Sequence, residues 1–217
     1  MMQVKRREFE SLRAKMVEQQ LIPRGIQDQG VLAAMRKVER HVFVTENQRG
    51  LAYEDIPLSI GHNQTISQPY IVAFMTEVLN LIGNERVLEV GAGCGYQSAI
   101  LGELVAEVYS LEIIKPLVDM AHRNIARTGY MNVEIIHGDA YAGWAEKAPY
   151  DAILVAAAAP TVPEILIEQL ADNGRMILPV GEGIQQLCLI TKKSGEVKKT
   201  MVLPVRFVPL VREDSIQ

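Results

Sequence analysis

Cysteine is scarce in this sequence of 217 residues, and its two copies, Cys94 and Cys188, stand far apart. They do not form a metal-binding spacing, and none of the four histidines stands at ligand spacing from another histidine, a cysteine or a carboxylate. We therefore expect free thiols, no bound metal and a reducing, cytoplasmic compartment for this protein.

Long hydrophobic runs and an excess of basic residues are also absent. The longest apolar stretch, Ala152 to Ala159, is far too short to span a bilayer, and no apolar segment follows the basic residues Lys5 to Arg7. The formal net charge is −4 and the sequence pI is about 5.6, which argues against a surface that binds polyanions. We therefore expect neither a membrane nor a nucleic acid as a partner.

Apolar residues are plentiful, at 48% of the chain against 22% charged residues. This balance is typical of a globular protein with a sizeable core, and the length suits a single domain over residues 1–217. Within this domain we expect N-terminal helices and a long substrate-type loop over residues 1–82. An α/β core is expected over residues 83–217.

Helical periodicity is clearest in the first part of the chain, where Pro23 and Gly25 interrupt the first apolar pattern. The predicted helices of this part cover residues 9–21, 27–38 and 70–81. Between the last two, Thr45 to Pro69 is expected to be a long irregular loop. A loop of this size within a compact domain is often functional.

From Arg86 onward, short apolar runs alternate with helical segments. The predicted strands are 86–90, 108–111, 133–136, 152–155, 175–178, 187–191 and 201–208, and the predicted helices are 97–105, 116–127 and 162–170. This alternation predicts a doubly wound, mostly parallel sheet with helices on both faces. The turn from Lys193 to Glu196 predicts a final antiparallel hairpin, whose lysines Lys192, Lys193, Lys198 and Lys199 are expected to be solvated.

The segment from Val87 to Tyr96 carries the strongest functional signal. A strand ends in glycines at alternate positions, Gly91, Gly93 and Gly95, and a helix follows, an order typical of a nucleotide-cofactor cradle. The next strand ends at Glu112, about 20 residues beyond the glycines, where a carboxylate that binds ribose hydroxyls is expected. A bulky tyrosine stands where a dinucleotide site has its third glycine, so S-adenosylmethionine, which has no phosphate, fits better.

Small and polar residues follow the other strands at the same predicted edge of the sheet. Asp139 follows the third strand, where it is suited to accept from an adenine amino group, and Ala156 to Pro160 follow the fourth. Each candidate has a structural alternative: Glu112 as a cap of the next helix, Asp139 as an Asx turn, and the glycines as close packing between strand and helix. Their shared place at the carboxyl ends of successive strands favours a cofactor site.

The loop from Tyr53 to Pro69 is rich in small hydroxyl and amide side chains, which bind polar ligands through short hydrogen bonds. Ser67 has no evident histidine–aspartate pair, so we expect it to form a hydrogen bond rather than to act as a nucleophile. The structural alternative is a surface loop with a turn at Gly61.

With these residues assembled, the chain resembles the protein-L-isoaspartate O-methyltransferases over most of its length. The motifs that carry the resemblance are residues 53–61, 64–69, 87–97, 138–139, 143–144, 148–153, 157–160, 178–181 and 205–210. The glycine loop is shared by methyltransferases generally, whereas Thr-Ile-Ser-Gln-Pro and Arg-Phe-Val-Pro-Leu mark this family. The chain departs from the family in its Gly-Ala-Gly-Cys-Gly turn and at Ala140, where glycine is usual.

The resemblance implies a Rossmann-like class I methyltransferase fold, with a mostly parallel seven-stranded sheet and an N-terminal helical cap. It also implies the transfer of a methyl group from S-adenosyl-L-methionine to the α-carboxyl of L-isoaspartyl residues in damaged proteins and peptides. The methyl ester then closes to a succinimide, which hydrolyses partly to normal aspartate. By this resemblance the protein is a repair enzyme, and we expect it to be a monomer.

Site residues follow from the same resemblance, position by position. Ser67 matches the family's active-site serine. The positions that match cofactor-binding residues are Gln64, Thr65, Ile66, Ser67, Gly91, Ala92, Gly93, Cys94, Gly95, Glu112, Asp139 and Ala140. The positions expected to bind substrate are Ile60, Ala157, Ala158, Val205 and Arg206.

The residue inventory agrees with this chemistry, because a substrate carboxylate is already ionised near pH 7 and needs no general base. Two alternatives stay open at this point. One keeps the fold and the cofactor but has a small molecule or RNA as the methyl acceptor, and the low basic charge argues against RNA. The other is a cofactor-binding fold that serves only as an interaction module.

Overall fold

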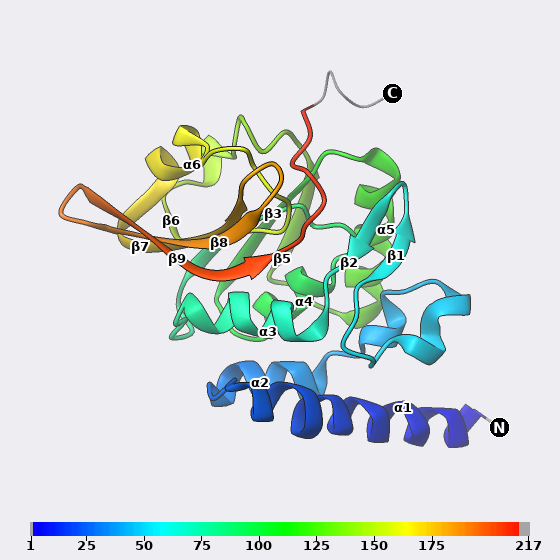
Figure 1. The fold of residues 1–217 in the computed structure, drawn as a ribbon. Coiled ribbons are helices and arrows are strands. Elements are labelled where there is room, and N and C mark those ends of the chain that lie inside the picture. The colour runs from blue at the N-terminus through cyan, green and yellow to red at the C-terminus, as the bar shows by residue number, and fades with distance from the viewer. Residues whose placement is uncertain (1, 213–217) are drawn as a thin grey trace.

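A seven-stranded sheet forms the centre of the protein, and the computed structural model describes residues 2–212 around it (Figure 1). The strands run in the order β5-β4-β3-β6-β7-β8-β9. Their bounds are Val133–His137 (β5), Glu107–Glu112 (β4), Arg86–Val90 (β3), Tyr150–Val155 (β6), Leu170–Val180 (β7), Gln185–Lys193 (β8) and Glu196–Val205 (β9). Neighbours from β5 to β7 are parallel, and β8 and β9 are antiparallel additions. The predicted α/β fold with a mostly parallel sheet is confirmed.

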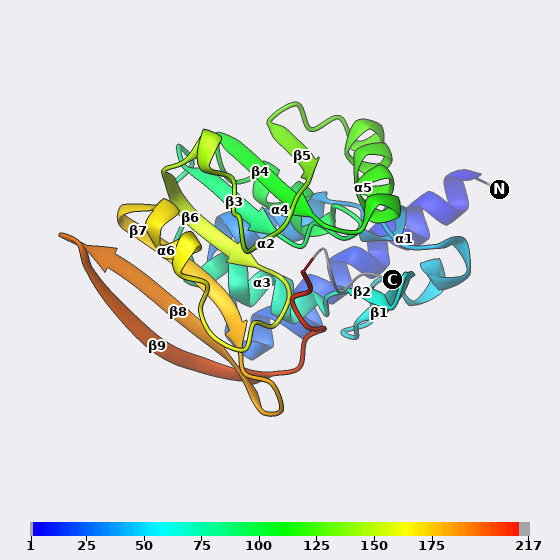
Figure 2. The ribbon, with the colours of Figure 1, turned by 90° about the horizontal axis from the view of Figure 1, so that it is seen from above.

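The central strands are buried on both faces, which is why their sequences are almost continuously apolar. Alternate residues enter two different cores: Val87 and Ile177 pack on one face, whereas Leu88 and Met176 pack on the other. Helices cover both faces, as predicted. In Figures 1 and 2, one face carries α3 (Pro69–Val78), α4 (Tyr96–Gly102) and α5 (Lys115–Thr128), and the opposite face carries α6 (Glu164–Gln169).

The N-terminal part forms a further layer outside α3 and α4 (Figure 1). It consists of α1 (Met2–Met16), a π-helical turn at Val17–Leu21, a 3₁₀ turn at Ile22–Arg24 and α2 (Gln29–Lys37). The predicted stop is confirmed at Gly25, which adopts a left-handed φ of +94°. Among the described residues, no helix combines the length and the apolarity that crossing a bilayer requires.

The segment predicted as an irregular loop, Thr45 to Pro69, contains regular structure. After a 3₁₀ helix at Glu46–Leu51, strands β1 (Leu58–Gly61) and β2 (Gln64–Ile66) form an antiparallel hairpin. The prediction was wrong here because the turn residues His62 and Asn63 adopt φ values of +53° and +56° without the glycine that usually marks such a turn.

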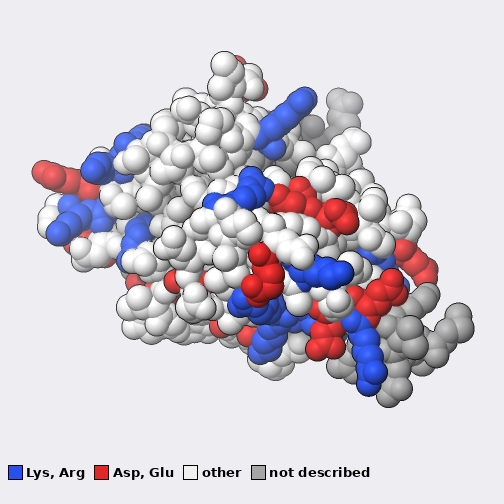
Figure 3. Space-filling model, turned by 60° about the horizontal axis from the view of Figure 1, so that its bottom comes forward, with Lys and Arg blue, Asp and Glu red and all other residues white. Residues whose placement is uncertain are grey.

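The second hairpin, of β8 and β9, is confirmed, and its turn has left-handed Ser194 and Gly195. Basic side chains gather around its free end, at the left of Figure 3, with acidic side chains beside them. The expectation that all four lysines are solvated was wrong for Lys192. Its ammonium donates to the carbonyl oxygens of Ile167 at 3.0 Å and Leu170 at 2.8 Å, so it caps the end of α6.

Candidate functional site

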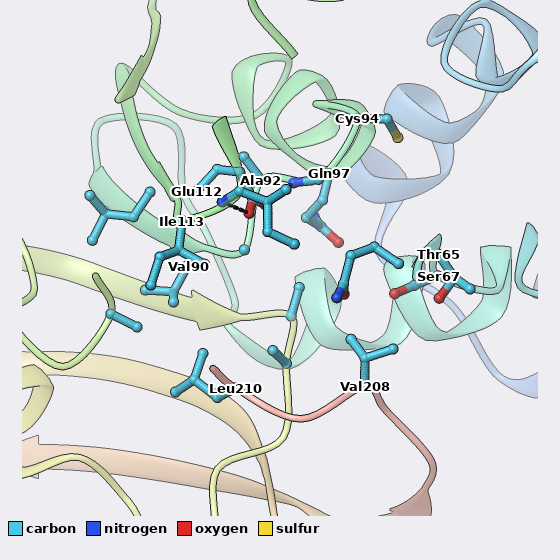
Figure 4. Close-up of a pocket in the computed structure, with 18 of the residues that line it drawn as sticks. Thr65, Ser67, Val90, Ala92, Cys94, Gln97, Glu112, Ile113, Val208 and Leu210 are labelled. Atoms are coloured by element: carbon cyan, nitrogen blue, oxygen red, sulfur yellow. Dashed lines mark hydrogen bonds between the residues drawn. The ribbon is translucent and has the colours of Figure 1, made fainter. Parts of the chain in front are cut away.

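A cavity lies at the carboxyl ends of the central strands. It is next to β3, from which the sheet continues to β4 and β5 on one side and to β6 and β7 on the other. Ligands of α/β sheets commonly bind at such a reversal of the strand order. Five segments far apart in the sequence line it: Gln64–Ser67, Gly91–Cys94, Leu111–Ile114, residues 156–157 and Val208–Val211. Gly138 and Ala140 complete the wall after β5. Figure 4 shows Glu112 and Ser67 on opposite sides of the cavity, with Val208 and Leu210 along one edge.

The glycine turn comes close to the cavity because its backbone adopts conformations that side chains disfavour. Gly91 and Gly93 have φ values of +87° and +54°, and both line the cavity. Gly95 has a different role: it begins α4 with φ +85°, and a Cβ there would stand 3.4 Å from the Cα of Ala121. The third glycine therefore allows α4 to pack against α5 and does not line the cavity.

Glu112 is the last residue of β4, and its carboxylate lines the cavity and holds the glycine turn in place. Its Oε2 accepts from the backbone N–H of Gly93 at 2.8 Å (dashed in Figure 4), and its Oε1 accepts from the N–H of Ile114 at 2.9 Å. The structural alternative, a cap of α5, is wrong, because Glu112 bonds to the N–H of Ile114, which precedes the helix, and α5 has no side-chain cap. Each carboxylate oxygen has a second lone pair, so Glu112 retains capacity for ligand hydroxyls.

A second carboxylate lies beneath the turn and was not predicted. Glu89 of β3 is fully buried, and its Oε2 accepts from the hydroxyls of Ser98 at 2.5 Å and Ser110 at 2.6 Å. Burial raises the pKa of Glu89 to about 7, against the lowering effect of these two hydrogen bonds. Glu89 joins β3, α4 and β4 directly behind the cavity. Its place in an apolar strand was the only sequence signal.

Asp139 occupies the place predicted for an adenine acceptor, but its side chain also makes the local turn. Its Oδ1 accepts from the N–H of Tyr141 at 2.8 Å, the Asx-turn geometry that we considered as the alternative. Its neighbours Gly138 and Ala140 line the cavity, whereas Asp139 itself is not among the lining residues.

A groove adjoins the cavity and shares four lining residues with it. Thr65, Ser67, Ala156 and Val208 line both, so Ser67 stands at the junction of the two spaces. The remaining walls of the groove are formed by Arg24, Pro57, Gln68, Tyr70, Ile71 and the segment from Leu203 to Phe207. A ligand in the cavity and a second ligand in the groove would meet beside Ser67.

Asp55 holds the segment that follows Ser67, and sequence reasoning missed it. Its Oδ1 accepts from the N–H of Tyr70 at 2.9 Å, and its Oδ2 accepts from the side-chain amide of Gln68 at 2.6 Å. The same Oδ2 pairs with the Arg24 guanidinium. The only sequence signal was an acidic residue in the loop, because its partners lie 13 to 31 residues away.

The predicted substrate residues divide into two groups. Ala157 lines the cavity, and Val205 and Arg206 line the groove. Ala158 instead anchors the C-terminal segment, because its N–H donates to Val208 at 2.8 Å and its carbonyl accepts from Leu210 at 2.7 Å. Ile60 is only 2% exposed, lines neither space and packs against Gly93, so its position supports the turn and not a direct contact with substrate.

The predicted cofactor residues Gln64, Thr65, Ile66, Ala92, Cys94 and Ala140 all line the cavity. Cys94 is buried, and burial raises the pKa of its thiol to about 11, so the thiol stays protonated at neutral pH. Its sulfur lies apart from the other labelled side chains in Figure 4. Among the described residues, no group of three or more histidines, cysteines or carboxylates is arranged to hold a metal.

Comparison with known proteins relates this chain to one family. Residues 11–215 match the family model described as protein-L-isoaspartate(D-aspartate) O-methyltransferase (PCMT). A protein-L-isoaspartate O-methyltransferase of Opitutus terrae is 54% identical, covering 93% of this chain and 87% of that protein. Another, of Gloeobacter violaceus, is 50% identical, with 91% and 98% covered.

Solved structures agree with the sequence comparison. A structure described as a protein-L-isoaspartate O-methyltransferase is 30% identical with a TM-score of 0.84, covering 94% of this chain and 66% of that chain. A structure described as a beta-aspartate methyltransferase from Plasmodium falciparum, in complex with S-adenosyl-L-homocysteine, is 32% identical with a TM-score of 0.80. It covers 94% of this chain and 98% of that chain.

Proposed function

This chain belongs to the protein-L-isoaspartate(D-aspartate) O-methyltransferase family, and we propose that its cavity holds the methyl donor while its groove holds the damaged polypeptide. The enzyme transfers a methyl group from S-adenosyl-L-methionine to the α-carboxyl of L-isoaspartyl residues. The observation that supports this division of the site is the junction of cavity and groove at Ser67.

The residues that line the cavity fit S-adenosyl-L-methionine. At Gly91 and Gly93 a ligand approaches backbone with positive φ and no Cβ, and Glu112 offers acceptor capacity for a ribose. Apolar Ile113, Leu210 and their neighbours suit an adenine ring. When bound, this cofactor supplies an electrophilic methyl group on a sulfonium.

We assign binding and positioning roles to the chain's own residues. Gln64 to Ser67, Gly91 to Cys94, Glu112 and Ala140 bind the cofactor, and Gly95 and Asp139 shape the turns beside it. Val205 and Arg206 contact the substrate in the groove, and Ala157 contacts its reacting end from the wall of the cavity. Ala158 and Ile60 act indirectly, through the C-terminal segment and the glycine turn.

Ser67 is the residue that we assign to the reacting carboxylate. Because that carboxylate is ionised at neutral pH, the site needs orientation and partial removal of water more than it needs a base. The Ser67 hydroxyl is a neutral donor that orients a carboxylate oxygen without an ion pair that would stabilise the ground state equally. Asp55 keeps the Ser67 segment in place through Gln68 and Tyr70.

Three further points extend the proposal beyond the site. We propose that residues 1–217 act as one domain, with residues 1–82 covering a core of residues 83–217. We also propose that the enzyme works as a monomer in the cytoplasm. Light scattering coupled to size-exclusion chromatography tests the oligomeric state.

The decisive experiment is transfer of labelled methyl from S-adenosyl-L-methionine to two peptides that differ only in carrying isoaspartate or normal aspartate. We expect base-labile label on the isoaspartyl peptide alone. Label on neither peptide, with S-adenosyl-L-homocysteine still bound in calorimetry, would overturn the assignment of isoaspartyl peptides as the acceptor. Equal label on both would overturn the specificity.

A further inference from the structure

The lining of the groove contains basic and no acidic side chains, although the chain as a whole carries a net charge of −4. Two arginines, Arg24 and Arg206, are among the residues that line it, and no lining residue is acidic. Asp55 lies behind the wall, where it forms an ion pair with Arg24 and accepts hydrogen bonds from the neutral donors of Gln68 and Tyr70. The pair is balanced in charge, so Arg206 leaves the groove with a net positive charge. A groove of this composition attracts acidic groups.

Arg24 comes from the 3₁₀ turn at Ile22–Arg24, far from the other groove residues in sequence. Its guanidinium carbon lies 3.4 Å from the centroid of the Tyr70 ring, and one of its nitrogens pairs with Asp55. These two contacts hold the side chain in one orientation, so little rotamer freedom remains to be lost on binding. The side chain is still 44% exposed, and its other N–H groups are available to a ligand.

The position of Arg24 relative to the reacting group follows from a shared partner. Arg24 and Gln68 both bond to Oδ2 of Asp55, and Gln68 directly follows Ser67. The guanidinium therefore lies near the side chain of Gln68, in the same groove as the serine that we assign to the isoaspartyl carboxylate. An extended polypeptide with its isoaspartate at Ser67 places a neighbouring side chain against this wall.

We propose that Arg24 determines substrate specificity by binding an acidic side chain next to the isoaspartyl residue of the damaged polypeptide. This inference rests on the proposed function, since it assigns the groove to the polypeptide. The ligand is a carboxylate of the substrate chain, recognised by the planar N–H groups of the guanidinium.

The test compares peptides blocked at both ends that carry isoaspartate and differ only by glutamate or glutamine at one flanking position. The position is varied over the two residues on either side. At the preferred position we expect the wild-type enzyme to favour glutamate by about fivefold in kcat/KM, mainly through KM. Arg24→Gln should abolish this preference, and Arg24→Lys should retain part of it.

Controls separate recognition from loosening of the wall. Arg24→Gln also removes a partner of Asp55, and any loss of order around Ser67 should slow both peptides equally without changing their ratio. Arg123→Gln, an exposed position on α5 away from the groove, removes the same charge and should leave the preference unchanged. Added salt should weaken the preference of the wild type.

Two results would overturn the inference. One is a glutamate preference that persists in Arg24→Gln, and the other is the absence of any preference in the wild type at all four positions. Failure of the proposed function looks different, because the wild-type enzyme would then methylate neither isoaspartyl peptide.

Discussion

Ser67 lines both the cavity and the groove, and its hydroxyl is a small neutral hydrogen-bond donor. We expect Ser67→Ala to lower kcat about tenfold, because a hydrogen bond to a charged group is lost from the reacting carboxylate. Cofactor affinity in calorimetry should change little. Ser59→Ala, an exposed serine on the neighbouring strand β1, is the matched control. An unchanged rate in Ser67→Ala would remove Ser67 from the mechanism.

Glu112 accepts two backbone hydrogen bonds and retains capacity for a ribose. Glutamine at this position has one acceptor oxygen instead of two and no charge, so Glu112→Gln should weaken cofactor binding about tenfold. Glu107→Gln, at the opposite end of the same strand and paired with Arg86 on the surface, should bind normally. Calorimetry with S-adenosyl-L-homocysteine measures both variants, and equal affinities would refute the role of Glu112.

Glu89 should make stability depend on pH in the neutral range. Burial raises its folded-state pKa to about 7 from an ordinary value of 4.5. The folded state therefore binds the Glu89 proton more tightly than the unfolded state does. The stabilisation that results is complete below the unfolded pKa and is lost as the pH rises through the folded pKa. Relative to Glu89→Gln, the wild type should lose free energy of unfolding between about pH 5 and pH 8.

Urea denaturation of both proteins across this range measures the difference, in which the other titrating groups cancel. Parallel stability curves would show that Glu89 does not titrate in this interval. Because Glu89 joins β3, α4 and β4 behind the glycine turn, the same comparison reports on the support of the cofactor cavity.

At the scale of the elements, the C-terminal segment from Val208 to Val211 forms one wall of the cavity. Its backbone bonds to Ala158 hold it against the sheet, and Arg212 stacks on Tyr141 at 4.1 Å from the ring centroid. Leu210→Ala removes apolar surface from this wall and should weaken cofactor binding about fivefold. Ile184→Ala, at an apolar position that is 89% exposed, should bind as the wild type does. Equal affinities would show that this wall does not contact the cofactor.

At the scale of the whole molecule, the N-terminal layer and the sheet share one core. A single cluster of buried side chains contains Met16 and Val31 of the N-terminal layer together with Ile100 and Leu117 of the helices on the sheet. We therefore expect one cooperative thermal transition. S-adenosyl-L-homocysteine at about one hundred times its Kd should stabilise the folded state by about 2.7 kcal/mol, which raises Tm by roughly 5–10 °C. Scanning calorimetry checks both, and two separate transitions would contradict the single-domain proposal.

Patterns of neighbouring residues were enough to predict the central strands, the glycine turn and the position of Glu112. The strands β3, β4 and β6 are short apolar runs, and the positive φ values of Gly91 and Gly93 require glycine at these places. Glu112 could be expected at the cavity because the end of a parallel strand is fixed once the strand is identified. The hairpin β1–β2 was missed, because its turn uses left-handed His62 and Asn63, which local preference alone does not select.

The sequence by itself therefore determined the α/β class, the glycine turn and the family to which the chain belongs, because these depend on residues close together along the chain. Only the tertiary structure decided which side chains share the groove that we assign to the substrate. Arg24 and Arg206 line it from distant segments of the chain, and Asp55 pairs with Arg24 from a third. The burial that raises the pKa of Glu89 is likewise a property of the packed molecule, because the strand sequence alone does not show how completely water is removed from a carboxylate.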